Sequence, residues 1–280
     1  MSVTQRGVCY SSPREASDTP EALLSTFAVN HFAILRNVGI DPPTYKYYDP
    51  KTIGLACNEF LGTLSSAPDR SVFLLHACAH NPTGVDPTQE QWSQIADVMV
   101  QKGHYAFFDS AYQGFASGDL DRDAWAVREF AKRGIPLLIC QSFAKNAGLY
   151  GERVGTLHII TSSAEVANKV RSQLSVLSRS EISNPPAHGA RLVALILNDP
   201  ELFEQWKQDI KTMAGRIIEM RKELYRLLTE EFKTPGTWNH IIDQIGMFRS
   251  ETFPSHTHSA PLIQVDLAAS LVSAPNKVWP

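Results

Sequence analysis

Three short apolar runs decide the fold of this chain: Val72-Phe-Leu-Leu-His-Ala77, His104-Tyr-Ala-Phe-Phe-Asp109 and Pro136-Leu-Leu-Ile-Cys140. Each run has the length and apolar character of a buried strand, and a fourth run covers Val154 to Ile160. Longer amphipathic stretches separate the runs along the chain. Strands that alternate with helices are typical of βαβ units, so we predict an α/β fold with a mostly parallel sheet flanked by helices.

Four helices are predicted around these strands. The first follows Thr88, which has capping-box spacing to Gln91. Its apolar face consists of Trp92, Ile95, Ala96 and Met99. Two more helices are expected at residues 124–133 and 164–177, and a long one at 201–228, where apolar residues recur every three or four positions. Those residues are Trp206, Ile210, Met213, Ile217, Met220, Leu224 and Leu228.

The composition of the 280 residues excludes several classes of partner. The formal net charge is -3, and the 26 basic side chains form no stripe that would neutralise a phosphate backbone. No apolar run approaches the roughly 20 residues that cross a bilayer, and the first residues lack a secretory signal. We therefore expect neither nucleic acid nor a membrane as partner, and a cytoplasmic location, with a mitochondrial one left open.

The cysteines share no CxxC spacing; they are Cys9, Cys57, Cys78 and Cys140. This spacing argues against a disulfide framework and against a structural zinc site, and it fits a reducing compartment. His76, Cys78 and His80 alternate along one strand as metal ligands would, but burial of that strand favours packing as their role. No metal site is expected.

Lys145 is the central candidate for chemistry, because ligands of open parallel sheets bind beyond the carboxyl ends of the strands. A partly desolvated lysine can act as nucleophile and proton carrier. The hydroxyl of Ser142 and the guanidinium of Arg153 suit the phosphate of an aldehyde cofactor. Each residue also has a structural interpretation when it is considered alone. Lys145 would then be a surface lysine, Ser142 a helix cap, and Arg153 an ion-pair partner of Glu152 or Asp109.

Three more polar residues follow the predicted strands. Asp109 suits the protonated nitrogen of a pyridine ring, and Tyr112 and Asn81 suit its phenolic oxygen. The alternatives are a helix cap for Asp109 and a core ring for Tyr112. Asn81 also begins Asn-Pro-Thr-Gly, a plain turn signal that is compatible with a cofactor contact.

Larger blocks of the sequence carry a family resemblance. They are His76–Trp92 with His-Asn-Pro-Thr-Gly, Phe108–Gly118 with Asp-Ser-Ala-Tyr, and Gln141–Gly155 with Ser-Phe-Ala-Lys-Asn. In order and spacing, these blocks resemble the eukaryotic aspartate aminotransferases, and the resemblance runs from about Asn30 to Phe248. It implies the large domain of a pyridoxal-phosphate-dependent transferase of fold type I, in incomplete form.

The resemblance also implies catalytic roles. The residue matching Lys145 condenses with the aldehyde of pyridoxal 5'-phosphate and moves the substrate proton. The residue matching Asp109 pairs with the ring nitrogen, and those matching Tyr112 and Asn81 bond the phenolic oxygen. The implied reaction is transamination between L-aspartate and 2-oxoglutarate, which gives oxaloacetate and L-glutamate and belongs to amino-acid metabolism.

The remaining implied roles concern binding. The residues matching Ser142 and Arg153 bind the cofactor phosphate, and Asn81 also contacts the substrate. Arg179, five residues before Asn184, matches the arginine that reaches across a homodimer interface to the distal carboxylate of the substrate. The implied partners are therefore dicarboxylic amino acids, 2-oxo acids and a second subunit.

The ends of the chain depart from the family pattern. Residues 1–29 and 249–280 are expected to be unrelated, the first of them without stable structure, while 30–211 form the large domain and 212–248 begin a small domain. Ala28 stands where the family has a ring-stacking tryptophan, and no phosphate loop or α-carboxylate arginine is recognisable. A truncated or mis-spliced chain is expected, and the alternative function is a catalytically dead, partly folded remnant.

Overall fold

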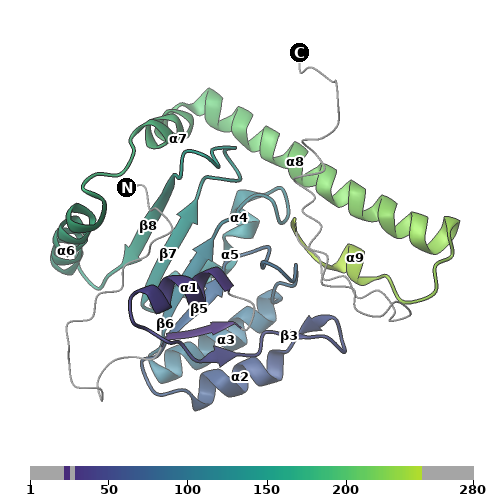
Figure 1. The fold of residues 1–280 in the computed structure, drawn as a ribbon, viewed down its shortest axis with the longest axis horizontal. Coiled ribbons are helices and arrows are strands. Elements are labelled where there is room, and N and C mark those ends of the chain that lie inside the picture. The colour runs from purple at the N-terminus through teal and green to yellow at the C-terminus, as the bar shows by residue number, and fades with distance from the viewer. Residues whose placement is uncertain (1–21, 26–28, 248–280) are drawn as a thin grey trace.

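The computed structural model describes residues 22–25 and 29–247. A six-stranded sheet forms the centre of this part of the chain (Figure 1). The sheet contains β1 (Ala22–Ser25), β2 (Thr44–Tyr45), β5 (Val72–His76), β6 (Tyr105–Ser110), β7 (Leu137–Ser142) and β8 (Gly155–Ile160). Their order is β2-β1-β5-β6-β7-β8, and every pair is parallel except β7 with β8. A separate antiparallel pair joins β3 (Tyr48–Asp49) to β4 (Gly54–Leu55). The predicted α/β class and the four predicted strands are confirmed.

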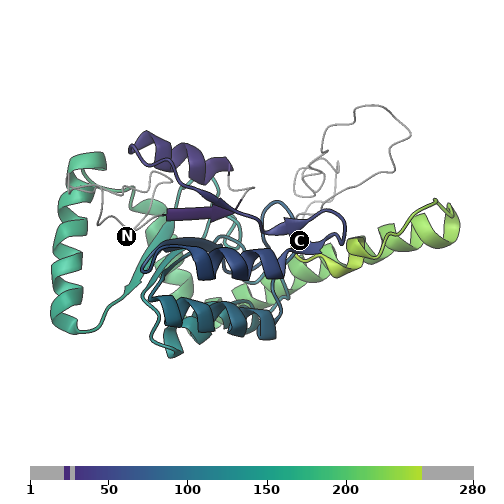
Figure 2. The same ribbon diagram turned by 90° about the horizontal axis from the view of Figure 1, so that it is seen from below.

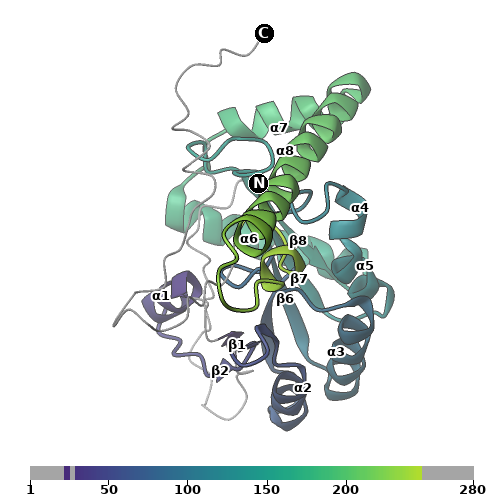
Figure 3. The same ribbon diagram turned by 90° about the vertical axis from the view of Figure 1, so that its right-hand side faces the viewer.

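One face of the sheet is covered by α2 (Cys57–Ser66), α3 (Gln89–Lys102) and α5 (Trp125–Lys132), as Figure 3 shows. The main apolar core lies between these helices and alternate residues of the central strands. The residues of β5, β6 and β7 in this core are Phe73, Leu75, Ala106, Phe108, Leu137 and Ile139. Burial of these side chains between two layers is what holds the sheet to its helices.

The opposite face carries α1 (Val29–Asn37), which lies on the other side of the sheet from α2 and α3 (Figure 2). Phe32 and Leu35 of α1 pack against Leu74 of β5 and Phe107 of β6. Because successive strand residues point to opposite faces, the residues two positions further along each strand also face α1. On β5 and β6 those residues are His76 and Asp109.

Helix α3 forms as its sequence predicts. The Thr88 hydroxyl accepts a hydrogen bond from the Gln91 backbone N–H, and the Gln91 side chain accepts one from the Thr88 backbone N–H, which together make the capping box. The predicted apolar face, Trp92 to Met99, is buried. The helix ends at Gly103, whose φ of 63° lies in the left-handed region that favours glycine.

The later helices differ in part from prediction. Helix α6 (Ala164–Ile182) ends five residues beyond the predicted Leu177 and has no buried side chain. It is followed by α7 (His188–Asn198) and α8 (Pro200–Arg226), and α8 continues into the π-helical segment η1 (Leu227–Glu231). Two short helices complete the described residues, α4 (Leu120–Asp123) and α9 (His240–Asp243).

The predicted apolar face of α8 is only partly buried. The predicted long helix is present, with Ile210 and Ile217 buried, but Met213 and Met220 of the same periodic set are 39% and 45% exposed. The buried stripe of α8 is narrower than its set of periodic apolar residues. The reason is that α8 crosses the rest of the molecule and extends beyond it (Figure 1). Close approach depends on Gly114, where an added Cβ would lie 2.6 Å from the Ile210 side chain.

The expectation that residues 1–29 lack stable structure is wrong for 22–25, which form β1. This strand is too short to show a sequence period, and it is stabilised by parallel pairing with β2 on one side and β5 on the other. Three ranges lie outside the described residues: 1–21, 26–28 and 248–280. Ala28 is in the second of them. The boundary at 211 falls inside the continuous helix α8 and stays a prediction. In the part of the chain that the structure describes, no helix is long and apolar enough to cross a membrane.

Replacing Phe130 by alanine should test the main core. Phe130 is fully buried, with ring centroids 5.1 Å from Phe108 and 5.7 Å from Trp92. The Phe130→Ala variant should lose about 3–5 kcal/mol of unfolding free energy, measured by chemical denaturation. The matched control is Phe232→Ala: Phe232 is 66% exposed, and the loss of unfolding free energy should stay within about 0.5 kcal/mol. Equal losses in both variants would contradict this description of the core.

Candidate active site

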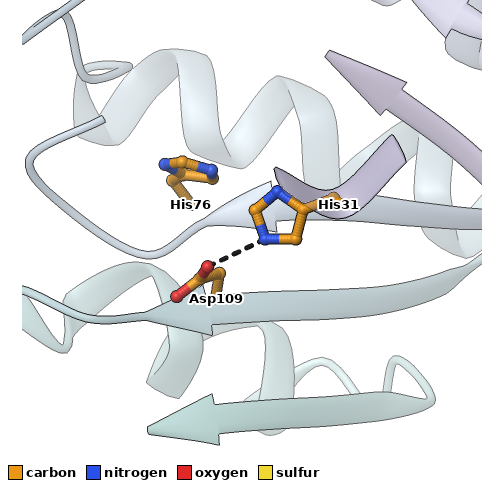
Figure 4. Close-up of side chains that lie close together, drawn as sticks. All are labelled: His31, His76 and Asp109. Atoms are coloured by element: carbon orange, nitrogen blue, oxygen red, sulfur yellow. Dashed lines mark hydrogen bonds and ion pairs between the residues drawn. The ribbon is translucent and has the colours of Figure 1, made fainter. Parts of the chain in front are cut away.

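Asp109 and His76 lie side by side at the carboxyl end of the sheet, because they are direct partners in the parallel register of β5 and β6. Both face α1, which brings His31 close to them (Figure 4). His31 Nε2 lies 2.9 Å from Asp109 Oδ2. Since an ionised carboxylate only accepts hydrogen bonds, His31 Nε2 is the donor of this bond.

The surroundings of Asp109 favour its charged form. Burial by itself raises the pKa of this carboxyl, but the hydrogen bond from His31 and the positive charge of nearby Lys145 oppose it, and the pKa lies below its ordinary value. The side chain remains 29% exposed, so the carboxylate is reachable from the site. Asp109 is therefore an anion that is held in place and available to a cationic group.

His76 is kept neutral by its surroundings. Its Nδ1 accepts a hydrogen bond from the Asn81 backbone N–H over 3.2 Å, and its ring lies 4.4 Å from that of His80. Burial lowers the pKa of His76 to about 4, against a smaller opposite effect of Asp109. Burial also holds the pKa of His80 well below its ordinary value. Both rings are neutral at pH 7.

Lys145 lies in the turn after β7, the strand next to Asp109. Burial lowers the pKa of its amine, Asp109 raises it, and the charge of Arg153 lowers it again, with a net shift downward. The Nζ atom lies 5.1 Å from the ring centroid of Tyr112 and 5.4 Å from that of Tyr150. The amine thus lies between two aromatic rings, and a larger fraction of it is neutral than for a solvated lysine.

Ser142 and Arg153 flank this lysine. Ser142 ends β7, and its hydroxyl accepts a hydrogen bond from the Ala144 backbone N–H over 3.2 Å. Arg153 has a φ of 51° and donates to the Tyr150 carbonyl oxygen over 3.1 Å. The sequence left open that Arg153 pairs with Glu152 or Asp109, and the contact with Tyr150 differs from that alternative. The positive charge of Arg153 lowers the pKa of Lys145.

The structure brings together most of the predicted site residues but not Arg179. Asn81 begins the turn after β5, with a cis bond to Pro82, and Tyr112 follows β6. Arg179 lies on α6, next to the outer strand β8 (Figure 1). Its exposed side chain donates to the Ser183 hydroxyl over 2.6 Å, away from the residues around Asp109.

Three residues around the site were not predicted from sequence. His31 pairs with Asp109 across 78 positions, a separation for which a single sequence gives no signal. His76 was assigned to packing with Cys78 and His80, and its ring does lie 4.4 Å from that of His80, but its proximity to His31 and Asp109 was not predicted. Tyr150 lies between two cations, since its ring is also 5.8 Å from the guanidinium of Arg153.

The family model described as aminotransferase class I and II matches residues 29–272. The chain therefore belongs to the class I and II aminotransferases. Members of this family depend on pyridoxal 5'-phosphate. The site has a chemistry that fits this cofactor: a lysine amine of lowered pKa, an ionised aspartate on the neighbouring strand and an arginine beside the lysine.

Within the family, the chain is similar to aspartate aminotransferases. It is 54% identical over 218 residues to the cytoplasmic aspartate aminotransferase of Schizosaccharomyces pombe, a match that covers 78% of this chain and 53% of that protein. The chain thus spans about half the length of this curated relative.

Solved structures give the same fold. A broad-specificity aminotransferase from Leishmania mexicana matches with a TM-score of 0.80 at 51% identity, over 84% of this chain and 58% of that one. The aspartate aminotransferase of Saccharomyces cerevisiae cytoplasm matches with 0.79 at 49% identity, over 83% and 59%. An aromatic amino acid aminotransferase from Burkholderia cenocepacia matches with 0.79 at 41% identity, over 82% and 57%.

Acidification should destabilise the chain through His76. Folding lowers the pKa of this imidazole from 6.5 to about 4, so the unfolded chain binds more protons between these values. The free energy of unfolding should fall as the pH drops through this window, by on the order of 3 kcal/mol from His76 alone. Urea denaturation of His76→Asn should show a shallower pH dependence, while His188→Asn, an exposed control, should keep the slope of the wild type. An identical slope in His76→Asn would contradict the assignment.

Proposed function

We propose that this chain carries the coenzyme site of an aspartate transaminase, which moves an amino group between L-aspartate and 2-oxoglutarate to give oxaloacetate and L-glutamate. The observation that carries the proposal is the placement of Asp109 in β6 and of Lys145 in the turn after the adjacent strand β7, both at the carboxyl ends of these strands. The similarity to enzymes named aspartate aminotransferase supports the substrate class.

Each candidate residue has a part in holding pyridoxal 5'-phosphate. Lys145 would take the aldehyde, Asp109 the ring nitrogen, and Tyr112 with Asn81 the phenolic oxygen. The hydroxyl of Ser142 and the guanidinium of Arg153 would bind the phosphate. When bound, the coenzyme supplies an electron sink for the pair of electrons that stays behind when the substrate α carbon loses its proton.

The protein groups act by charge and by proton transfer. The lowered pKa of Lys145 leaves part of its amine neutral, so that Nζ can act as nucleophile and can accept and return a proton. Asp109 stays ionised because His31 donates to Oδ2, and an ionised carboxylate stabilises a proton on a pyridine nitrogen. The Tyr112 ring against Nζ limits where the amine can move.

The substrate class and the assembly rest on Arg179. Its guanidinium is exposed on α6, a helix without buried side chains, where it can reach a second subunit. In a homodimer it would bind the distal carboxylate of aspartate or glutamate of the neighbouring site. Similar structures include broad-specificity and aromatic aminotransferases, and a cationic Arg179 favours dicarboxylates over those substrates. We also propose a cytoplasmic location, which the similarity to a cytoplasmic relative supports.

Reductive trapping tests the coenzyme site. Pyridoxal phosphate and borohydride added to the purified 280-residue chain should yield one stable adduct, located at Lys145 by peptide mass spectrometry. Lys145→Ala should abolish the adduct, whereas Lys207→Ala should retain it, because Lys207 pairs with Glu204 on α8. Trapping that is equal in both variants would remove Lys145 from its proposed role.

Turnover of aspartate tests the whole proposal against its alternative. An Arg179→Leu variant should lose roughly 10- to 150-fold in kcat/KM for aspartate, equivalent to about 1.5–3 kcal/mol for a charged hydrogen bond. Arg171→Leu, an exposed arginine of the same helix, is the control and should be unaffected. Trapping at Lys145 without any aspartate turnover would instead support the second candidate, a catalytically dead remnant of such an enzyme.

A further inference from the structure

His31, His76 and Asp109 form a cluster of three metal-capable side chains. They come from three different elements, α1, β5 and β6, and converge on one point at the end of the sheet (Figure 4). One possible ligand atom from each residue lies within 4.8 Å of the others. Two imidazoles and one carboxylate are a donor set that zinc and other divalent transition ions accept.

Two nitrogens of this cluster lack a hydrogen-bond partner within the described residues. His76 Nε2 and His31 Nδ1 are both buried and unpartnered. A buried polar atom without a partner is unfavourable, and it often marks a position that an ion or ligand occupies. Of these two nitrogens, His76 Nε2 is the one that an ion in the cluster would contact, so the cluster combines a suitable donor set with one nitrogen that the protein itself leaves unpartnered.

We propose that the coenzyme-free chain binds one divalent transition-metal ion at this cluster, with Zn²⁺ as the ion to test. The ligands would be His31 Nε2, His76 Nε2 and Asp109 Oδ2, with solvent in a fourth position. Metal–ligand bonds of ordinary length in a tetrahedral site place such atoms roughly 3.4 Å apart. His31 Nε2 and Asp109 Oδ2 are 2.9 Å apart, so they need to separate only slightly, and a ligand atom of His76 lies within 4.8 Å of a ligand atom of each.

Metal binding requires a change of tautomer in both rings. His31 Nε2 now carries the proton shared with Asp109, and in the metal-bound state its proton moves to the unpartnered Nδ1. His76 Nδ1 accepts from the Asn81 backbone N–H, so its proton lies on Nε2 and must also move to Nδ1. A protonated Nδ1 can no longer accept from Asn81, so the weak 3.2 Å bond is lost, and the new bond between Nε2 and the metal must outweigh that loss.

The site has a consequence for the coenzyme, which rests on the proposed function. The ring nitrogen of pyridoxal phosphate and the metal ion would both use the Asp109 carboxylate. The two positive charges would repel each other at close range, so we expect the ring nitrogen and the metal ion to compete for Asp109. Zinc is then a competitive inhibitor of coenzyme loading.

Calorimetric titration of the coenzyme-free 280-residue chain with Zn²⁺ tests the site directly. One ion per chain should bind in wild type, and His76→Asn should weaken binding by at least about tenfold. His188→Asn controls for an exposed histidine. The His256→Asn/His258→Asn variant controls for the histidines beyond residue 247 and should bind as wild type does.

A second measurement keeps the test independent of how well His76→Asn folds. Wild-type chain loaded with Co²⁺ should show the intense visible absorption of a tetrahedral site, and prior loading with pyridoxal phosphate should prevent it. Absence of a bound ion, loss of binding only in the His256→Asn/His258→Asn variant, or cobalt bands that coexist with bound coenzyme would each overturn the proposal. Zinc binding with no coenzyme adduct at Lys145 would leave the metal site in place and contradict the proposed function alone.

Discussion

The in-register parallel pairing of β5, β6 and β7 is the constraint on which the candidate site depends. It places His76 opposite Asp109, and it brings the turn that carries Lys145 to the same edge of the sheet. A slip of one residue in β6 would turn Asp109 to the opposite face, among Phe73, Phe108 and the helices packed there. The aromatic core on that face therefore fixes the position of the catalytic candidates as well as the fold.

The pKa values of Asp109 and Lys145 are set by several opposing effects rather than by one strong ion pair. Burial opposes the charged forms of both Asp109 and Lys145, while their mutual attraction favours them. The outcome differs between the two because His31 donates a hydrogen bond to Asp109, whereas Lys145 faces the repulsive charge of Arg153. An anionic acid and a partly neutral amine at the same sheet edge suit a coenzyme with one cationic nitrogen and one aldehyde. They also explain why a metal ion and the coenzyme ring would compete for the same carboxylate.

Local patterns in the sequence were sufficient for much of the fold. The capping box at Thr88 and the apolar runs of β5 to β7 rely on neighbours in the chain, and these predictions are confirmed. Strand β1 was not predicted, because its four residues are stabilised by two strands distant in sequence. The exposed methionines of α8 show the same limit, since periodicity indicates an apolar face but not how wide a contact surface it meets.

The sequence predicted some of the residues that the structure brings together at the site, but not the contacts between them. Strand ends and family resemblance identified Asp109 and Lys145, whose roles stay predictions. The pairing of His31 with Asp109 depends on where α1 crosses the sheet, which a single sequence does not specify. For the same reason His76 was interpreted as a packing residue, although it completes the group around Asp109.

The central claim is that Asp109 and Lys145 face one coenzyme ring, and nitrogen NMR of bound pyridoxal phosphate labelled at the ring nitrogen tests it most directly. The account predicts a protonated ring nitrogen in the wild-type chain and an unprotonated one in Asp109→Ala, because only the carboxylate stabilises the proton there. A ring nitrogen with the same chemical shift in both proteins would contradict it.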